Sequence, residues 1–135
     1  MARGILEIDK KFRLQCLTDS TFATYISNRL FLNKANTNPT YPLAVYQVVN
    51  DDIESTFGSP ARFQRVYQVD TYARATQSTL TLFSKTDSLL NTLHKSTFTV
   101  TDNGVGHIRA LESGQLFIES EFKRVTQRFL LQCGA

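Results

Sequence analysis

Histidine, cysteine and tryptophan are scarce in this sequence, which limits the chemistry that it can carry. It has two histidines, two cysteines and no tryptophan in 135 residues. His94 and His107 have no Cys, Asp or Glu at the spacing of a metal-binding motif, so no zinc site is expected. Cys16 and Cys133 lie near opposite ends and show no repeated spacing, so the sequence predicts two free thiols and no disulfide framework.

A strong net charge is also missing. Fifteen Lys and Arg residues against twelve Asp and Glu give a net charge of +3. Residues 1–67 hold eight basic and six acidic residues, and residues 68–135 hold seven and six. Nucleic-acid binders usually gather their basic residues on one segment or face, so this even spread does not favour DNA binding as the main activity. No apolar run approaches the roughly 18 residues of a membrane-spanning helix, and no membrane partner is expected.

The familiar catalytic motifs are absent as well. The Gly-Val-Gly run at 104–106 lacks the third glycine of a phosphate-binding loop, and no serine stands in a Gly-x-Ser-x-Gly elbow. The densest acidic group is Asp51, Asp52 and Glu54, in a turn-rich stretch where water should surround the carboxylates. Carboxylates act as acid–base pairs only when their environments push their pKa values apart. We therefore predict a protein that is not an enzyme, with no catalytic, cofactor-binding or metal-binding residues.

The residues that are present predict one domain spanning 1–135. Hydrophobic residues make up 41% of the chain, and ten Phe and five Tyr supply bulky side chains for a core. Apolar residues recur at helical spacing in 5–17, in a short segment after the capping residues 18–20, and in 77–95. The predicted buried stripe of the last helix is Leu82, Phe83, Leu89, Leu90 and Leu93.

Segments rich in β-branched and aromatic residues predict strands at 41–49, 62–74, 98–100 and 124–131. Two shorter extended runs flank a predicted hairpin turn at Ser113-Gly114, while 33–40 and 50–61 are predicted loops and 103–106 a turn. Both faces of 41–49 are apolar, so this strand either lies centrally or meets another chain. The order α-α-β-β-α-β-β-β predicts an α+β fold with a mixed, mainly antiparallel sheet and helices packed on one face.

Arginines recur along the predicted strands, and two interpretations of them stay open. On 62–74, Tyr67 and Val69 are predicted to face the core, while Gln68 and Asp70 face solvent. The strand arginines mark either this solvent side or a subunit interface, where arginine is enriched and pairs with carboxylates of a neighbour. They are Arg62, Arg65, Arg74, Arg124 and Arg128.

Four segments between residues 19 and 74 carry a resemblance to a known family. They are Asp19-Ser-Thr-Phe-Ala-Thr-Tyr-Ile-Ser-Asn-Arg29-Leu-Phe31, the strand Tyr41-Pro-Leu-Ala-Val-Tyr-Gln-Val-Val49, the acidic loop 50–61, and Gln68-Val-Asp-Thr-Tyr-Ala-Arg74. In their order and spacing they resemble the tail-completion, or tail-terminator, proteins of long-tailed bacteriophages. The resemblance covers roughly 5–95. The sparse alanine content of 77–95 departs from the family pattern.

The resemblance implies a structural virion protein that forms a ring, typically of six copies, at the head-proximal end of the tail tube. Such a ring stops tube polymerisation and joins the tail to the neck or connector. Its partners would be other copies of the chain, the tail tube protein and a neck or connector protein. DNA would pass through the lumen without specific recognition. The protein would be assembled in the host cytoplasm and reside in the tail or neck of the virion.

A closed ring requires two different, complementary surfaces on each subunit. The predicted contact residues are Asp51, Asp52, Glu54 and Phe57 of the acidic loop, and Arg62, Arg65 and Arg74 of the following strand. Two alternatives to a tail terminator stay open. One is another head–tail connector component, such as a stopper, and the other is a small nucleic-acid-binding module.

Overall fold

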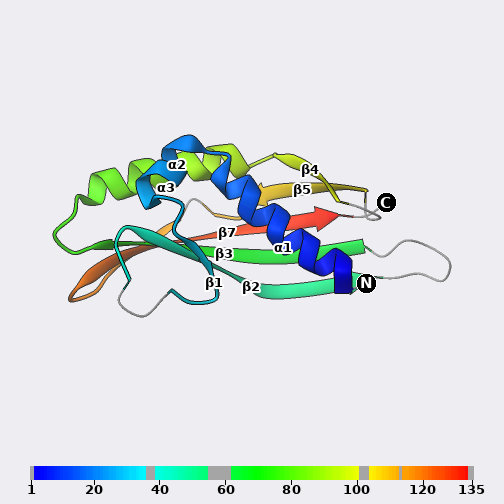
Figure 1. The fold of residues 1–135 in the computed structure, drawn as a ribbon, viewed down its shortest axis with the longest axis horizontal. Helices are drawn as coiled ribbons and strands as arrows, with labels where there is room; N and C mark the ends of the chain where they lie inside the picture. Colours follow the sequence, from blue (N-terminus) through cyan, green and yellow to red (C-terminus); the bar gives the residue numbers. More distant parts are fainter. Residues whose placement is uncertain (1, 36–38, 55–61, 101–103, 113, 134–135) are drawn as a thin grey trace.

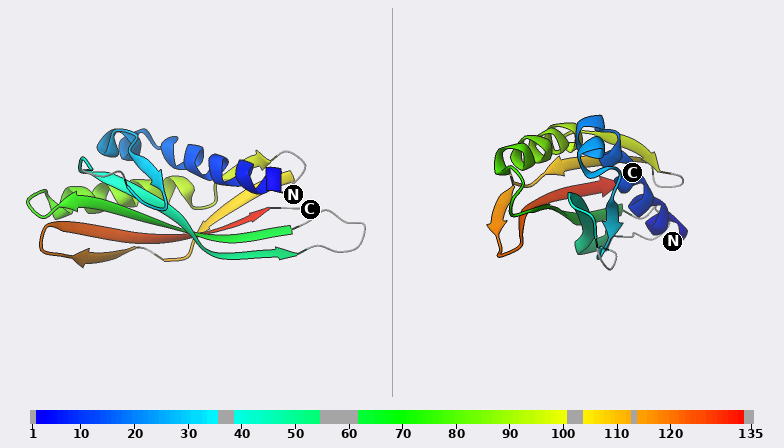
Figure 2. Two further views of the ribbon diagram at one scale, coloured as in Figure 1. Left: turned by 60° about the horizontal axis from the view of Figure 1, so that its bottom comes forward. Right: turned by 60° about the vertical axis from the view of Figure 1, so that its left-hand side comes forward.

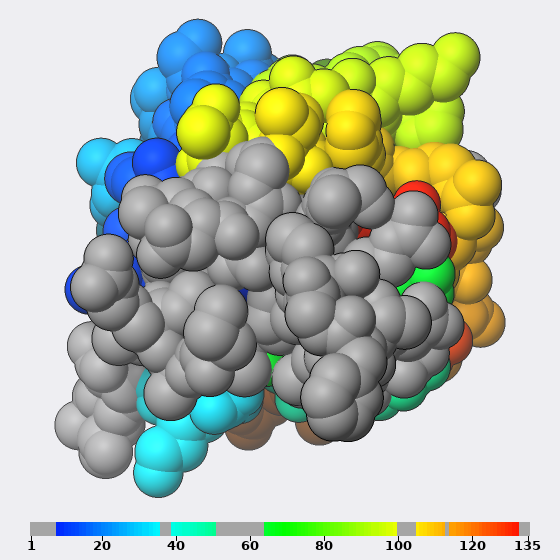
Figure 3. Space-filling model, turned by 90° about the vertical axis from the view of Figure 1, so that its right-hand side faces the viewer, coloured from blue at the N-terminus to red at the C-terminus, as the bar shows by residue number. Residues whose placement is uncertain are grey.

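Helices cover one face of a curled sheet in the computed structural model of the chain (Figure 1). The structure describes residues 2–35, 39–54, 62–100, 104–112 and 114–133, and its description of side chains starts at Ile8 and omits those of 51–54, 62–63, 100, 104 and 133. The elements are α1 (Ala2–Leu17), α2 (Ser20–Ile26), β1 (Leu30–Leu32), β2 (Leu43–Glu54), β3 (Arg62–Arg74), α3 (Thr79–Leu93), β4 (Thr97–Val100), β5 (Gly104–Ala110), β6 (Gln115–Ile118) and β7 (Phe122–Cys133). Seen from one end, the blue residues of α2 and the yellow-green residues of α3 lie along the top of the molecule (Figure 3).

The sheet has seven strands in the order β1-β2-β3-β7-β5-β4, with β6 also paired to β7. The β1–β2 pair is parallel and the other pairs are antiparallel. The prediction of an α+β fold with a mixed, mainly antiparallel sheet and helices on one face is therefore confirmed. The element order differs from the predicted one by two strands: β1 is additional, and four strands follow α3 instead of three.

The predicted amphipathic helices form, and their buried residues follow the expected spacing. Ile8, Phe12 and Cys16 of α1 are fully buried against the sheet. Asp19 caps α2 because its Oδ1 accepts hydrogen bonds from two backbone N–H groups of the first turn, as is typical of a helix N-cap. These local signals lie within a few residues of each other, which is why the sequence alone predicted both helices.

The buried stripe of α3 differs from the prediction at Phe83. Leu82, Thr86, Leu89 and Leu93 are the buried positions, whereas Phe83 is exposed. The polar Thr86 is tolerated inside because its hydroxyl donates back to the carbonyl of Leu82 at 3.0 Å. This hydrogen bond satisfies the hydroxyl within the helix, as buried polar groups require.

The prediction of a loop at 50–61 is wrong for residues 50–54, because β2 continues to Glu54. A bulge between Val48 and Asn50 shifts the register, after which Asp51 pairs with Arg65 and Glu54 with Arg62. Opposite charges at facing positions favour strand pairing, so an acidic stretch that looks like a loop can extend a strand beside a basic one. Residues 55–61 lie outside the described residues.

The predicted hairpin at Ser113-Gly114 is also wrong. β5 and β6 do not pair with each other; both pair with β7, the first through Gly106–Ala110 and the second through Gln115–Ile118. They lie one after the other along the 12-residue β7, which is long enough to pair with both. The tight connection instead joins β6 to β7, where the N–H of Glu119 donates to the carbonyl of Phe122.

The predicted turn at 103–106 also needs correction, because Gly104 to Gly106 begin β5. Gly106 pairs with Phe98 of the neighbouring strand β4. The Phe98 ring lies against Gly106, on the side where a Cβ would stand. A Cβ at position 106 would come within 2.7 Å of Cζ of Phe98. The glycine is therefore needed for the close approach of the ring, as is common for glycine inside a strand.

Candidate docking surface on the open face of the sheet

One face of the sheet carries no helix, and we call it the open face (Figure 2). Side chains alternate between faces along a strand. Tyr67 and Val69 of β3, and Phe129 and Leu131 of β7, pack into the core beneath the helices, so their neighbours in sequence lie on the open face. On the central strands its described residues are Leu43, Val45, Gln47, Gln64, Val66, Gln68, Asp70, Tyr72, Arg74, Phe122, Arg124, Thr126, Arg128, Leu130 and Gln132.

The open face gathers arginines that lie far apart in the sequence. Arg74, Arg124 and Arg128 come from β3 and β7, and Arg109 of β5 pairs with Leu130 on the same face. Asp70 is the single carboxylate among the strand residues of this face whose side chains are described. The even spread of charge along the chain thus hides a basic surface, which appears only when the strands are placed side by side.

Aromatic rings order one end of the open face. The guanidinium carbon of Arg74 lies 5.2 Å from the centre of the Tyr41 ring. Tyr41 in turn stacks on Phe122 at 6.3 Å with an interplanar angle of 13°, and Phe122 meets Tyr72 edge-on at 5.4 Å. Contacts of arginine with aromatic faces are attractive and limit side-chain motion. Preordered arginines and aromatic residues of this kind are the residues that dominate protein–protein interfaces.

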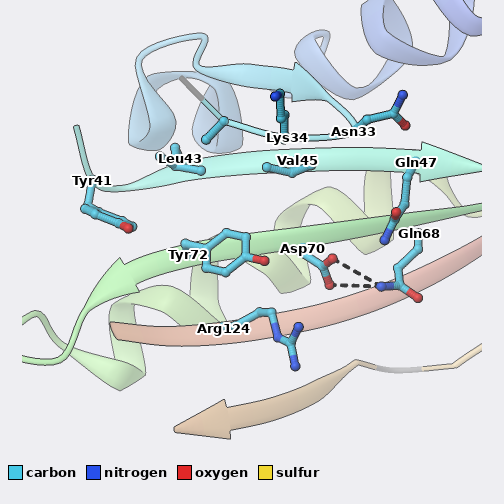
Figure 4. A pocket seen from close by; sticks show the side chains of 11 residues that line it. Asn33, Lys34, Tyr41, Leu43, Val45, Gln47, Gln68, Asp70, Tyr72 and Arg124 are labelled. Atoms are coloured by element: carbon cyan, nitrogen blue, oxygen red, sulfur yellow. Dashed lines mark hydrogen bonds between the residues drawn. The ribbon is translucent and has the colours of Figure 1, made fainter. Parts of the chain in front are cut away.

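A hollow of about 320 Å³ opens beside this aromatic layer (Figure 4). Leu43 and Val45 of β2 form an apolar wall of the hollow. Asn33 and Lys34, which follow β1, lie at its rim. The remaining lining residues are Ala35, Tyr41, Gln47, Gln68, Asp70, Tyr72 and Arg124. The hollow therefore combines apolar, aromatic and charged surface from three strands.

Asp70 lies at the base of the hollow and is 4% exposed. Its Oδ1 accepts from the Thr126 hydroxyl at 2.6 Å, and the Gln68 amide donates to Oδ1 and Oδ2 at 3.3 and 3.1 Å. Within the described residues, no lysine or arginine forms an ion pair with this carboxylate. The sequence predicted that Asp70 faces solvent, and this is wrong because the residue is buried at the hollow.

Tyr72 and Arg124 form the side of the hollow nearest β6. Burial raises the pKa of Tyr72, and the negative charge of Asp70 adds to this effect, while the neighbouring Arg124 guanidinium opposes it. Arg124 lies over the Phe117 ring of β6, with its guanidinium carbon 4.5 Å from the ring centre. In Figure 4 the guanidinium turns toward β6 and away from Asp70.

The structure separates the sequence-predicted contact residues. The backbones of Asp51, Asp52 and Glu54 belong to β2 and that of Arg62 begins β3, but their side chains lie outside the described residues. Phe57 also lies outside them. Whether these five residues contact a neighbouring subunit stays a prediction.

Of the two predicted arginines whose side chains are described, one is on the surface and one is not. Arg74 lies on the open face and is exposed, as is Arg128, whereas Arg124 on the same face is half-buried. Arg65 is 6% exposed and lies under α1, where it pairs with Asp9. This side chain is therefore buried in the isolated subunit, and its contact with a neighbouring subunit stays a prediction.

Sequence reasoning missed Asp70, Tyr72 and Lys34 as parts of one site. The alternation of polar residues on 124–128 was a usable signal for the open face. No signal in the sequence brings the segment after β1 to β3, because the two are joined only through the parallel β1–β2 pair. One local contact fixes this arrangement: Arg29 donates from Nε and Nη2 to the carbonyl of Pro42, at 3.1 and 2.7 Å.

Within the described part of the chain, a histidine site, a metal site and a membrane-spanning helix were the other possibilities. His94 Nδ1 accepts the backbone N–H of Ala110 at 3.1 Å, so this histidine links the end of α3 to β5. No group of three or more His, Cys, Asp or Glu side chains among the described residues is placed to hold a metal ion. None of the helices described is both long and apolar enough to cross a bilayer.

Comparison with known proteins shows a likeness in fold. No family model matches the chain, and no curated protein matches it in sequence. The matching solved structures include a chain from the virion of a native gene transfer agent particle, with a TM-score of 0.67 and 10% sequence identity. The match covers 90% of this chain and 90% of that one. At so low an identity the likeness shows a shared fold.

Proposed function

We propose that the chain is a structural protein of a phage-like virion, without enzymatic activity. The observation that carries this proposal is the fold match to a virion chain, which extends over 90% of both proteins. Because the match covers nearly all of both chains, the similarity concerns the whole fold and not one part of it. A fold alone does not fix a function, so the finer role rests on the residues.

Within such a particle, we propose that the protein forms a tail-terminator ring of six copies at the head-proximal end of the tail tube. The segments that resemble tail terminators support this role because the first and the second are in direct contact. The Arg29 guanidinium of the first segment holds the Pro42 carbonyl at the start of the second. The tail tube protein and a neck or connector protein would be its partners, and DNA would pass through the lumen.

Particles made without this protein test the role directly. A tail terminator limits tube growth, so its loss should give overlong tails in electron micrographs. Tails of normal length beside unattached heads would instead assign the protein to another head–tail connector component, such as a stopper. Particles of unchanged shape and number would contradict both roles.

The assembly state gives a second test. Size-exclusion chromatography with light scattering should show a ring, or a monomer that forms a ring when purified tail tubes are added. A chain that stays monomeric and does not bind tube ends would contradict the terminator role.

The arginines of the open face favour one competing function, a small nucleic-acid-binding module. Among the residues of this face whose side chains are described, four arginines against one carboxylate make it attractive to phosphate groups. A gel shift at low micromolar protein that weakens steeply with added salt, together with normal tails in particles lacking the protein, would support this alternative.

A further inference from the structure

Asp70 is a buried carboxylate whose charge is not balanced inside the described part of the chain. It accepts hydrogen bonds from Gln68 and Thr126, both of which are neutral, and no ion pair to it occurs among the described residues. Burying a charge is costly unless a countercharge is present. A cation from outside the subunit would supply the missing half of this site.

Two basic side chains line the hollow, but neither forms an ion pair with Asp70 among the described residues. Arg124 stacks on Phe117 with its guanidinium carbon 4.5 Å from the ring centre, and it turns away from Asp70 (Figure 4). Lys34 is exposed at the rim, after β1. The hollow is consequently not occupied by a cation of the chain itself.

The walls of the hollow match the two halves of a basic side chain. Lys and Arg carry an aliphatic stem that packs on apolar surface and a charged head that seeks an acceptor. Leu43 and Val45 offer the apolar surface, and the Asp70 carboxylate offers the acceptor. The hollow measures about 320 Å³, at the lower end of the roughly 300–1,000 Å³ range of ligand sites. This size suits one side chain.

We propose that the hollow binds a lysine or arginine side chain presented by a neighbouring protein subunit, with its cationic head on Asp70 and its stem along Leu43 and Val45. The chemistry of the site stands on these three residues, whereas the source of the side chain rests on the proposed function. A ring subunit must present two unlike surfaces, and this hollow would be the recessed half of one contact.

Small probes on the isolated protein test the chemistry without any tail. Nα-acetyl-lysine amide and Nα-acetyl-arginine amide should shift the backbone amide resonances of 43–47 and 68–72 saturably in ¹H–¹⁵N spectra. Nα-acetyl-norleucine amide, which has the stem without the charge, should shift them at least roughly tenfold more weakly, because a hydrogen bond to a charged group contributes about 1.5–3 kcal/mol. Equal shifts from the norleucine probe, or no saturable shift from either basic probe, would overturn the proposal.

A probe of opposite charge decides between Asp70 and the basic residues around it. Nα-acetyl-glutamate amide should leave the 68–72 resonances unchanged, and stronger binding of this probe than of the basic ones would show that Lys34 and Arg124 define an anion site instead. Spermidine carries the same ammonium chemistry in a free molecule. Tighter binding of spermidine than of the lysine and arginine probes would replace the docking site by a small-molecule site.

Variants link the effect to the carboxylate. Asp70→Asn should weaken binding of the basic probes roughly tenfold or more, whereas the matched change Asp87→Asn on the exposed face of α3 should not alter it. Unchanged binding in the Asp70→Asn variant would overturn the proposal. If that variant does not fold, the four probes on the unmodified protein still decide. The two proposals can fail separately. If the protein binds the basic probes but particles lacking it have normal tails, the binding site is supported and the proposed function is contradicted.

Discussion

Asp9 of α1 and Arg65 of β3 form an ion pair, with the carboxylate oxygen 2.5 Å from Nη1. The Tyr67 hydroxyl donates to the same oxygen, and the Tyr67 ring stacks on Phe12 of α1 at 4.1 Å. The contact joins residues 56 positions apart. One carboxylate therefore fixes the position of the first helix on the sheet.

Replacement of Asp9 by Asn should destabilise the fold by about 2–3 kcal/mol, because two buried donors lose a charged acceptor. Urea unfolding followed by circular dichroism measures this change. Asp87→Asn, at an exposed position of α3, is the matched control and should change stability by less than about 0.5 kcal/mol. Equal stability of the Asp9→Asn variant and the unmodified protein would show that the ion pair contributes nothing.

Stability should fall as the pH rises above about 10, the ordinary pKa of tyrosine. Burial raises the pKa of Tyr67 in the folded protein, and its hydrogen bond to Asp9 adds to the effect. The folded state therefore keeps this proton while the unfolded state loses it, so the stabilisation is complete below pH 10 and is lost above it. Unfolding free energies measured from pH 8 to 11 should decline less steeply for Tyr67→Phe. The same slope for both proteins would exclude Tyr67 as the cause.

Replacement of Gly106 by Ala should destabilise the protein by about 1–3 kcal/mol, a range typical of overpacked sites. The new methyl group would lie 2.7 Å from the ring of Phe98. Thermal unfolding of Gly106→Ala, Phe98→Leu and the double variant measures the coupling. The double variant should be more stable than the sum of the single effects predicts, and strict additivity would mean that the clash is relieved elsewhere.

Reversal of charge at Arg128 should impair tail assembly without unfolding the subunit, if the open face contacts another subunit. Arg128 is exposed and makes a 3.3 Å hydrogen bond to Gln68, so Arg128→Glu should cost under about 1 kcal/mol of stability. The control is Lys85→Glu on α3, which lies on the opposite side of the molecule. Tail length in electron micrographs should change in the first variant only. An equal effect of both variants would point to a general loss of charge balance.

The sequence allowed the helices and most strands to be predicted because their signals are local. Ile8, Phe12 and Cys16 repeat at helical spacing whatever surrounds them, and the N-cap at Asp19 depends on the next few residues. The fold class follows from the order of such elements. Arg65 shares the parity of Tyr67 and Val69, but the sequence led us to count it among the surface arginines, because its partner Asp9 lies 56 residues away and no local signal joins the two.

The parts that were missed depend on pairing between distant segments. The extension of β2 past the bulge requires β3 opposite the acidic residues, and the collinear β5 and β6 require a long β7 beside them. The hollow around Asp70 brings together the chain after β1, β2, β3 and β7. Periodicity indicates which face a residue occupies but not which distant residue covers it, so a buried Asp70 could not be distinguished from a solvated one.

The position of β7 between β3 and β5 has a consequence for synthesis. Residues 122–133 are synthesised after all the other strands of the sheet, yet they hold its two halves together. A nascent chain interrupted before residue 122 would leave β3 and β5 without their shared neighbour, so prematurely terminated products should be cleared by proteases before they can join a growing particle.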